Sequence, residues 1–246
     1  GTLLQHKKEL MLHTDLKRDE KLLFFTTTGW MMWNWMVSAL ANKSCIITYD
    51  GSPQHPSIEQ LWEICDRENI EVFGTSPNFM NACMKNNLHP RSRFSLENLK
   101  TILTTGSPLL PKHYEWTYNS VKRDLHLASI SGGTDIISCF MLGNPLLPVK
   151  SGEIQGPGLG MNITAKNIQG EDVTNEKAEL VCSSPFVSMP LYFLQDPDGK
   201  KYRQSYFEFF PNQEVWRHGD YIKMTPDKSV IVYGRSDATL NPGGVR

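Results

Sequence analysis

The 246-residue chain has only five cysteines, and none of them stands in a C-x-x-C pair or beside clustered histidines. A disulfide framework or a zinc site is therefore not expected. An odd, dispersed set of cysteines is typical of reduced, buried thiols in a cytoplasmic protein. The five are Cys45, Cys65, Cys83, Cys139 and Cys182. The sequence also shows no secretory signal at its start, which agrees with a cytoplasmic location.

Net charge and long hydrophobic runs are lacking as well. The 25 basic and 26 acidic side chains leave a net charge of −1, which gives no electrostatic reason to expect nucleic acid or an anionic membrane as partner. The longest apolar stretch, 22–40, is interrupted at 26–29 and at Asn34 and is too polar to span a bilayer. We therefore expect small-molecule partners, no nucleic acid and no membrane insertion.

Short apolar runs alternate with helical patterns over the first 145 residues. Strands are expected over 22–25, 44–49, 71–73, 101–104 and 126–130. Helices are expected over 30–41, 58–68 with Ser57 as N-cap, 77–85 and 111–121. Strands separated by helices of this length form βαβ units, so the pattern predicts an α/β fold with a largely parallel sheet and flanking helices.

The amino-acid composition changes after residue 145, where glycine and proline become frequent. Short strands are expected over 161–165, 179–182, 221–224 and 230–233, with turn residues between them. These strands predict a smaller antiparallel β subdomain or partial barrel. We therefore divide the chain into an α/β subdomain (1–145), a β-rich subdomain (146–233) and a final segment (234–246).

A carboxylate and a guanidinium stand at the two ends of one short β segment near the end of the chain. Asp220 follows Gly219, and Arg235 follows Gly234. An aspartate at a tight glycine turn can accept two hydrogen bonds from a vicinal diol such as a ribose, and the arginine can reach the same ligand. His218 has no nucleophile in a G-x-S-x-G setting to serve, so we interpret it as a turn histidine.

The run 129–135, Ser-Ile-Ser-Gly-Gly-Thr-Asp, follows a predicted strand. Open α/β sheets bind ligands at the carboxyl ends of their strands. Its glycines would let backbone N–H groups approach a phosphate, to which Thr134 could also donate, and Asp135 is a suitable oxygen ligand for Mg²⁺. Taken by itself, the run is better explained by an ordinary Gly-Gly turn.

Two further segments follow predicted strands. The turn at 104–108 could lay its backbone against a flat ring, although a plain α/β connection explains it better when the turn is taken by itself. Gly29 and Trp30 stand at the mouth of a strand, where they could border an acyl pocket. The methionines and tryptophans that follow are interpreted as the core face of a helix.

The order and separation of these segments resemble the adenylate-forming acyl-CoA synthetase superfamily, and within it the members that activate acetoacetate. The runs 129–135, 218–221 and 234–242 carry the closer match. The resemblance implies a ligase of lipid and ketone-body metabolism that uses ATP and Mg²⁺ to form acyl-AMP and then transfers the acyl group to CoA. It also implies that the distant segments converge on one AMP-binding cleft.

The resemblance further assigns roles to residues. It implies nucleotide contacts for Gly106, Ser107, Pro108, Ser131, Gly133, Thr134, Asp220 and Arg235, with the first three beside adenine, Thr134 at the α-phosphate and Asp220 at the ribose. Gly29, Trp30, Thr105 and Gly132 would border the acyl group. Thr134, Asp135 and Arg246 would take part in catalysis, Asp135 near Mg²⁺, and Asp237 would be a hinge. Ser131 departs from the superfamily, which usually has an aromatic residue there to stack on adenine.

Gly132 is a second departure, because acetate-activating relatives carry tryptophan at the matching position. Replacing an indole by hydrogen would open room for a four-carbon acyl group. The resemblance therefore predicts that Gly132→Trp suppresses the use of acetoacetate.

The superfamily's Ser/Thr/Gly-rich phosphate loop and its C-terminal domain with a catalytic lysine are absent from this sequence. We therefore interpret the chain as an internal piece of a protein more than twice as long. Losing three charged phosphate contacts would cost about 5 kcal/mol, so the isolated chain is expected to bind ATP poorly and to turn over nothing. Two alternatives stay open at this point: a ligase for another short- or medium-chain acid, and a non-catalytic nucleotide-binding α/β module.

Overall fold

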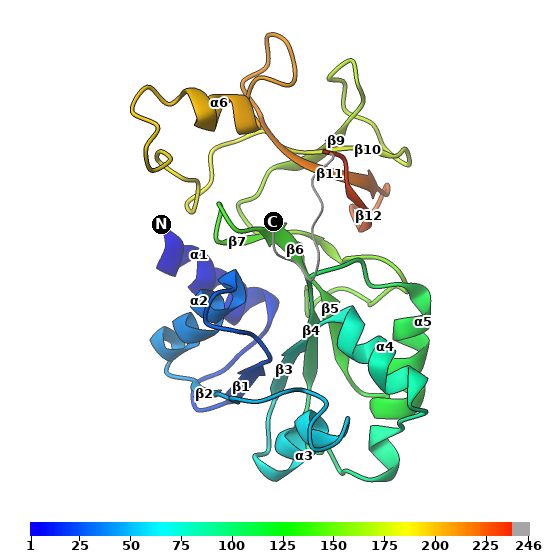
Figure 1. Cartoon of the computed structure of the whole chain (residues 1–246). Helices are drawn as coiled ribbons and strands as arrows, with labels where there is room; N and C mark the ends of the chain where they lie inside the picture. Colours follow the sequence, from blue (N-terminus) through cyan, green and yellow to red (C-terminus); the bar gives the residue numbers. More distant parts are fainter. Residues whose placement is uncertain (238–246) are drawn as a thin grey trace.

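The computed structural model describes residues 1–237 and has a five-stranded parallel sheet at its centre (Figure 1). The strands lie in the order β2-β1-β3-β4-β5. They are β1 (Lys21–Phe24), β2 (Cys45–Ile47), β3 (Val72–Thr75), β4 (Thr101–Thr104) and β5 (His126–Ser129). Every neighbouring pair is parallel, as the alternation of strands and helices predicts.

Helices cover both faces of this sheet. On one face lie α1 (Thr2–Lys8) and α2 (Met31–Val37), continued by the irregular turns Glu9–His13 and Ser38–Asn42. On the other lie α3 (Gln60–Arg67), α4 (Pro77–Lys85) and α5 (Pro111–Trp116), followed by the 3-10 turn Pro90–Ser92 after α4 and the π turn Thr117–Val121 after α5. Side chains alternate along each strand. Leu22 and Phe24 therefore join the core under α2, whereas Leu23 joins the core under α3 and α4.

The two helices after β2 and β3 begin in different ways. Ser76 caps α4, because its side chain accepts a hydrogen bond from the Phe79 backbone N–H at 3.3 Å and Pro77 occupies the first turn. The expected cap of α3 is wrong. The Ser57 hydroxyl instead accepts from the Glu59 backbone N–H at 3.1 Å and closes a turn before the helix starts.

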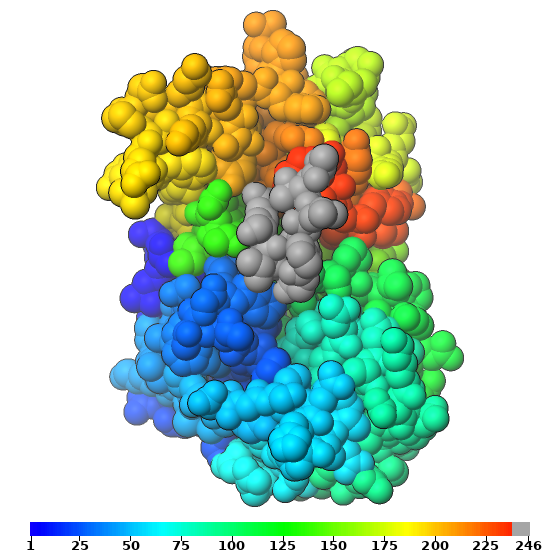
Figure 2. Space-filling model, in the orientation of Figure 1, coloured from blue at the N-terminus to red at the C-terminus, as the bar shows by residue number. Residues whose placement is uncertain are grey.

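Two antiparallel sheets follow the parallel one, which confirms the predicted fold class. The first is β6 (Ser131–Gly133), β7 (Ser138–Leu142) and β8 (Gly156–Pro157). The second has the order β12-β11-β10-β9 and contains β9 (Ile163–Lys166), β10 (Ala178–Cys182), β11 (Trp216–Met224) and β12 (Val230–Arg235). Figure 2 shows the β-rich part, yellow to red, stacked on the α/β part, blue to green. The subdomain boundary at residue 145 stays a prediction, and the three-stranded sheet has strands on both sides of it.

The structure contains elements that the sequence patterns did not indicate. Helices α1 and α6 (Lys200–Tyr206) were not expected, and residues 131–133 form strand β6 where a Gly-Gly turn was the competing interpretation. Among residues 1–237, no helix is long and apolar enough to cross a bilayer.

Strand β11 begins five residues before the predicted position, so the interpretation of His218 as a turn histidine is wrong. Arg217 pairs with Val181 on β10, and Tyr221 pairs with Glu179. The residues between them form a bulge centred on Gly219, whose φ of +83° suits glycine. Because the bulge bends the strand without ending it, His218 lies inside a sheet.

All five cysteines are free thiols, but the expectation that all are buried is wrong for Cys45, which is exposed on the edge strand β2. Burial raises the pKa of Cys83 to about 11 and also raises the thiol pKa values of Cys65, Cys139 and Cys182. A raised pKa leaves little reactive thiolate near neutral pH.

We therefore expect an aromatic disulfide reagent at about pH 8 to modify Cys45 rapidly in the native chain, and the other four thiols only after denaturation. The released thiolate, followed by absorbance, measures both phases. A Cys45→Ser variant serves as the control and should lack the fast phase. Rapid release from that variant would show that a second thiol is accessible in the native fold.

Candidate functional site

A cavity of about 280 Å³ lies where the three sheets meet. Its walls come from the start of α2, the loop after β4, the end of β5, strand β6 with the following turn, and the β11–β12 hairpin. The site is therefore at the carboxyl ends of the parallel strands, where α/β sheets bind ligands. The lining residues are Trp30, Met31, Met32, Thr105, Gly106, Ser107, Pro108, Ser129, Ile130, Ser131, Gly132, Gly133, Thr134, Ser138, Cys139, Ile154, Asp220, Val232, Gly234 and Arg235.

Most of the residues singled out in the sequence reach this cavity. Trp30, the run 105–108 and the run 131–134 line its α/β side, and Asp220 and Arg235 line the opposite side. Segments as far apart in the sequence as Trp30 and Arg235 thus face one space, as the resemblance implies.

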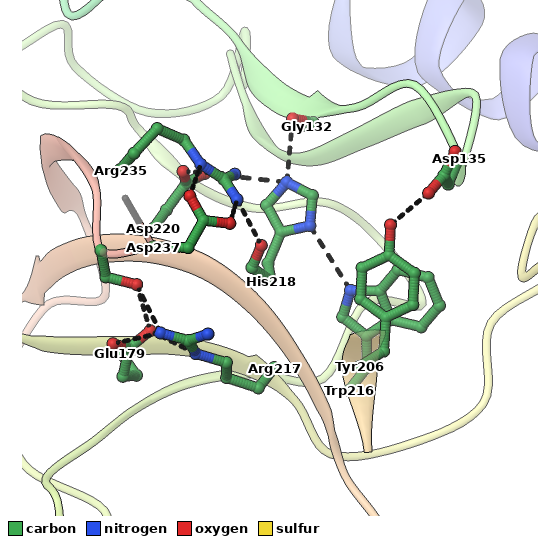
Figure 3. Close-up of polar contacts among 11 residues, drawn as sticks. Gly132, Asp135, Glu179, Tyr206, Trp216, Arg217, His218, Asp220, Arg235 and Asp237 are labelled. Atoms are coloured by element: carbon green, nitrogen blue, oxygen red, sulfur yellow. Dashed lines mark hydrogen bonds and ion pairs between the residues drawn. The ribbon is translucent and has the colours of Figure 1, made fainter. Parts of the chain in front are cut away.

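Other predicted residues do not line the cavity. Gly29 is not among the lining residues, although Trp30 next to it is. Asp135 is exposed in the turn after β6, and its carboxylate accepts a hydrogen bond from the Tyr206 hydroxyl (Figure 3). Asp237 contacts Arg235 but is not a lining residue, and Arg246 lies outside the described residues.

Asp220 and Arg235 form a partly buried ion pair across the β11–β12 hairpin. The two residues are direct register partners, and Arg235 Nη1 donates to Asp220 Oδ1 at 2.9 Å. Arg235 Nε also donates to Asp237 Oδ1 at 3.0 Å, and its Nη2 donates to the His218 carbonyl at 3.2 Å. Burial lowers the pKa of Arg235, but the two carboxylates outweigh this and hold it above its ordinary value. The pair is thus a fixed, charged group at the edge of the cavity.

A second ion pair, not indicated by the sequence, supports the base of this hairpin. Arg217 donates two hydrogen bonds of 2.9 Å to the buried carboxylate of Glu179 on β10. The Ser236 hydroxyl closes the network, accepting from Arg217 at 2.9 Å and donating to Glu179 at 2.6 Å. Bidentate pairs of this kind fix geometry as well as charge. Glu179 lies 38 residues from Arg217, so no local pattern could have found it.

Several other lining residues were also missed. Met31 and Met32 were interpreted as core, and Ser138, Cys139, Ile154 and Val232 gave no signal at all. Met31 and Met32 directly follow Trp30, which was predicted to border the pocket. The same prediction could have included them. The others reach the cavity only through the packing of β7, β8 and β12 around it.

The space beside Gly132 differs from the sequence-based expectation. A Cβ at this position would overlap the Ser138 carbonyl oxygen and lie 2.7 Å from Cys139 Cα, so the backbone of β7 occupies the place of a side chain. Gly132 borders the cavity through its backbone. Acyl selectivity was explained from the sequence by a glycine where acetate-activating relatives have tryptophan. For a tryptophan to fit at this position, β7 has to be placed differently in those relatives.

The arrangement is chemically suited to a ligand with a flat ring, a diol and an anionic group. Loop 105–108 offers backbone to a ring, the carboxylate of Asp220 offers acceptors to hydroxyls, and Thr134 with the glycines of β6 offers donors to an anion. Trp30, Met31 and Met32 add an apolar wall. Within residues 1–237, no group of three acidic, histidine or cysteine side chains could enclose a metal ion.

Comparison with known proteins gives consistent matches. Residues 2–193 match the protein-family model described as AMP-binding enzyme. The chain is 51% identical over 246 residues to acetoacetyl-coenzyme A synthetase of Rhizobium meliloti (strain 1021) and 48% identical over 247 residues to acetoacetyl-CoA synthetase of Gallus gallus. Each match covers 100% of this chain but only 38% and 37% of those proteins.

A solved structure resembles the chain equally well. Acetoacetyl-CoA synthetase from Streptomyces lividans matches with a TM-score of 0.91 and 44% identity, over 98% of this chain and 38% of that one. The chain thus spans well under half the length of the relatives that it matches.

Proposed function

The chain belongs to the family of AMP-binding enzymes, and from this premise we propose that it is part of an acid–thiol ligase that converts acetoacetate, ATP and CoA to acetoacetyl-CoA, AMP and pyrophosphate. The observation that carries the proposal is the convergence of loop 105–108, segment 131–134 and the Asp220–Arg235 pair on one cavity. The names of the relatives supply the acid and the thiol.

Each wall of the cavity has a role in this proposal. Gly106, Ser107 and Pro108 flank adenine, Asp220 accepts from the ribose hydroxyls with Arg235 beside it, and Thr134 donates to the α-phosphate. The acyl group lies along Trp30, Thr105 and the β6 backbone. Asp237 is proposed as the hinge and Arg246 as a phosphate contact. The complete protein is proposed to be cytoplasmic.

Mg²⁺ fits this site as a companion of the nucleotide. It typically keeps several waters and binds one or two carboxylates together with substrate phosphates, so a full protein cage is not needed. Asp135 adjoins Thr134 and is proposed as the single carboxylate, which requires its hydrogen bond with the Tyr206 hydroxyl to break and its side chain to turn toward the cavity. When bound, the ion neutralises charge on the phosphates.

The proposed reaction has two steps. A carboxylate oxygen of acetoacetate attacks the α-phosphorus of ATP, which forms acyl-AMP and releases pyrophosphate. The CoA thiolate then attacks the acyl carbon and releases AMP. The residues of this chain contribute by holding the nucleotide and the acid in line and by placing donors at the phosphate, which is where such transfers obtain most of their acceleration.

Mass spectrometry of acyl-AMP tests the proposal in the protein encoded by the complete reading frame, hereafter the complete protein. With ATP, Mg²⁺ and a panel of acetoacetate, acetate, propionate and butyrate, we expect acyl-AMP to form fastest from acetoacetate. A preference for acetate or propionate would contradict the choice of acid. No acyl-AMP from any acid would favour a non-catalytic nucleotide-binding module.

A further inference from the structure

The imidazole of His218 lies between Gly132 on β6 and the β11–β12 hairpin (Figure 3). His218 is not one of the residues that line the cavity. Its side chain is only 2% exposed. His218 Nε2 is 3.2 Å from the carbonyl oxygen of Gly132 on β6. The same nitrogen is 3.7 Å from Oδ2 of Asp220, which lies two residues further along β11. The ring therefore joins β6 to β11, the strand that also carries the carboxylate assigned to the ribose.

Neighbouring groups determine which ring nitrogen carries the proton. The indole Nε1 of Trp216 can only donate, and it lies 3.4 Å from His218 Nδ1, which therefore accepts. The proton of the neutral ring is then on Nε2, where it is donated to the Gly132 carbonyl.

The orientation of the ring is fixed by packing. Phe140 meets it edge to face at a centroid distance of 4.8 Å. A Cβ at Gly133 would lie 2.5 Å from His218 Cε1, so a glycine is needed on β6 for the ring to approach this closely. Two bonded nitrogens and contacts on the ring edge and face leave the imidazole one orientation.

We propose that His218 is a positioning residue that sets the separation of Gly132 and Thr134 from Asp220, and thereby aligns the acyl and α-phosphate side of the cavity with the ribose side. The inference rests on the proposed function, because it concerns the same reaction. His218 is no catalytic residue, since its buried ring does not reach the cavity. It acts through its hydrogen bond to Gly132 on β6 and through β11, the strand that it shares with Asp220.

Kinetics of His218→Phe and His218→Gln in the complete protein test this role. Phenylalanine keeps an aromatic ring but removes both hydrogen bonds, whereas the glutamine amide retains one donor and one acceptor. For His218→Phe we expect kcat for acyl-AMP formation to fall by about 10- to 100-fold, the scale of a misplacement of about 1 Å between reacting groups. The KM values for ATP and acetoacetate should change much less, and His218→Gln should recover most of the lost kcat.

His13→Phe is the matched control. His13 is also buried and also joins two backbone segments, with Nδ1 2.8 Å from the Gly143 carbonyl and Nε2 accepting from Leu159 N–H at 3.0 Å, but it does not border the cavity. This variant should lose thermal stability and keep its kcat once folded.

The outcomes separate the two proposals. A loss of kcat in His218→Phe with recovery in His218→Gln supports the positioning role. An unchanged kcat in His218→Phe, a loss equal to that of His13→Phe, or a failure of glutamine to restore activity overturns it. Absence of acyl-AMP formation by the wild-type protein would instead overturn the proposed function.

Discussion

Replacing Asp220 with alanine in the complete protein is expected to lower kcat/KM for ATP by about 100-fold or more. Two hydrogen bonds from ribose hydroxyls to a carboxylate are worth about 1.5–3 kcal/mol each, and about 1.4 kcal/mol corresponds to a factor of ten. The carboxylate also holds the partly buried guanidinium of Arg235, whose Nη1 lies 2.9 Å from Asp220 Oδ1. The loss of Asp220 therefore affects both the ribose contact and the orientation of its neighbour.

Asp220→Asn and Asp227→Ala make the comparison specific. The amide keeps the shape of the side chain and one acceptor oxygen, so its effect should be smaller than that of alanine. Asp227 lies in the exposed turn of the same hairpin, where it pairs with Lys150, and its removal should leave ATP use unchanged. Initial rates at varied ATP measure all three variants, with a thermal melt to show that each is folded. Near-wild-type kcat/KM in folded Asp220→Ala would refute the ribose role.

Gly132→Ala is expected to destabilise the chain by about 1–3 kcal/mol, because one added methyl group has to displace the backbone of β7. The clash involves Ser138 and Cys139, which belong to the rim of the cavity, so a folded variant should also lose acyl-AMP formation. Chemical denaturation measures the first effect, and initial rates with acetoacetate measure the second.

Gly156→Ala is a control in the same three-stranded sheet. Its Cβ would meet only the Lys228 carbonyl oxygen, at an ordinary contact distance of 3.5 Å, so stability should change little.

A tryptophan at position 132 tests the explanation of acyl selectivity that was based on the sequence. If Gly132→Trp folds normally and prefers acetate, the pocket interpretation taken from the sequence holds and the steric one is wrong.

The sequence by itself determined the architecture of the α/β part. Apolar segments such as 22–25 and 101–104, each followed by a helical pattern, predict the parallel sheet, and the helix predicted over 77–85 has the bounds of α4. These features depend on neighbours close in the chain. The same locality explains why the loops that end β4 and β5 could be nominated: their position follows from the strand before them.

The tertiary structure alone decided how the nominated residues work together. Glu179 meets Arg217, and His218 meets Gly132, because β11 places residues far apart in sequence beside one another. Two further features depend on which strand lies beside a residue. A side chain at position 132 would meet the backbone of β7, and Cys45 is exposed because β2 is an edge strand. Local sequence patterns indicate hydrophobic periodicity and the propensity for helix or strand. Which side chains are buried and which strands pair is determined by packing across the sheets. The sequence could therefore indicate which segments border the site, and only the fold could show the contacts that hold it.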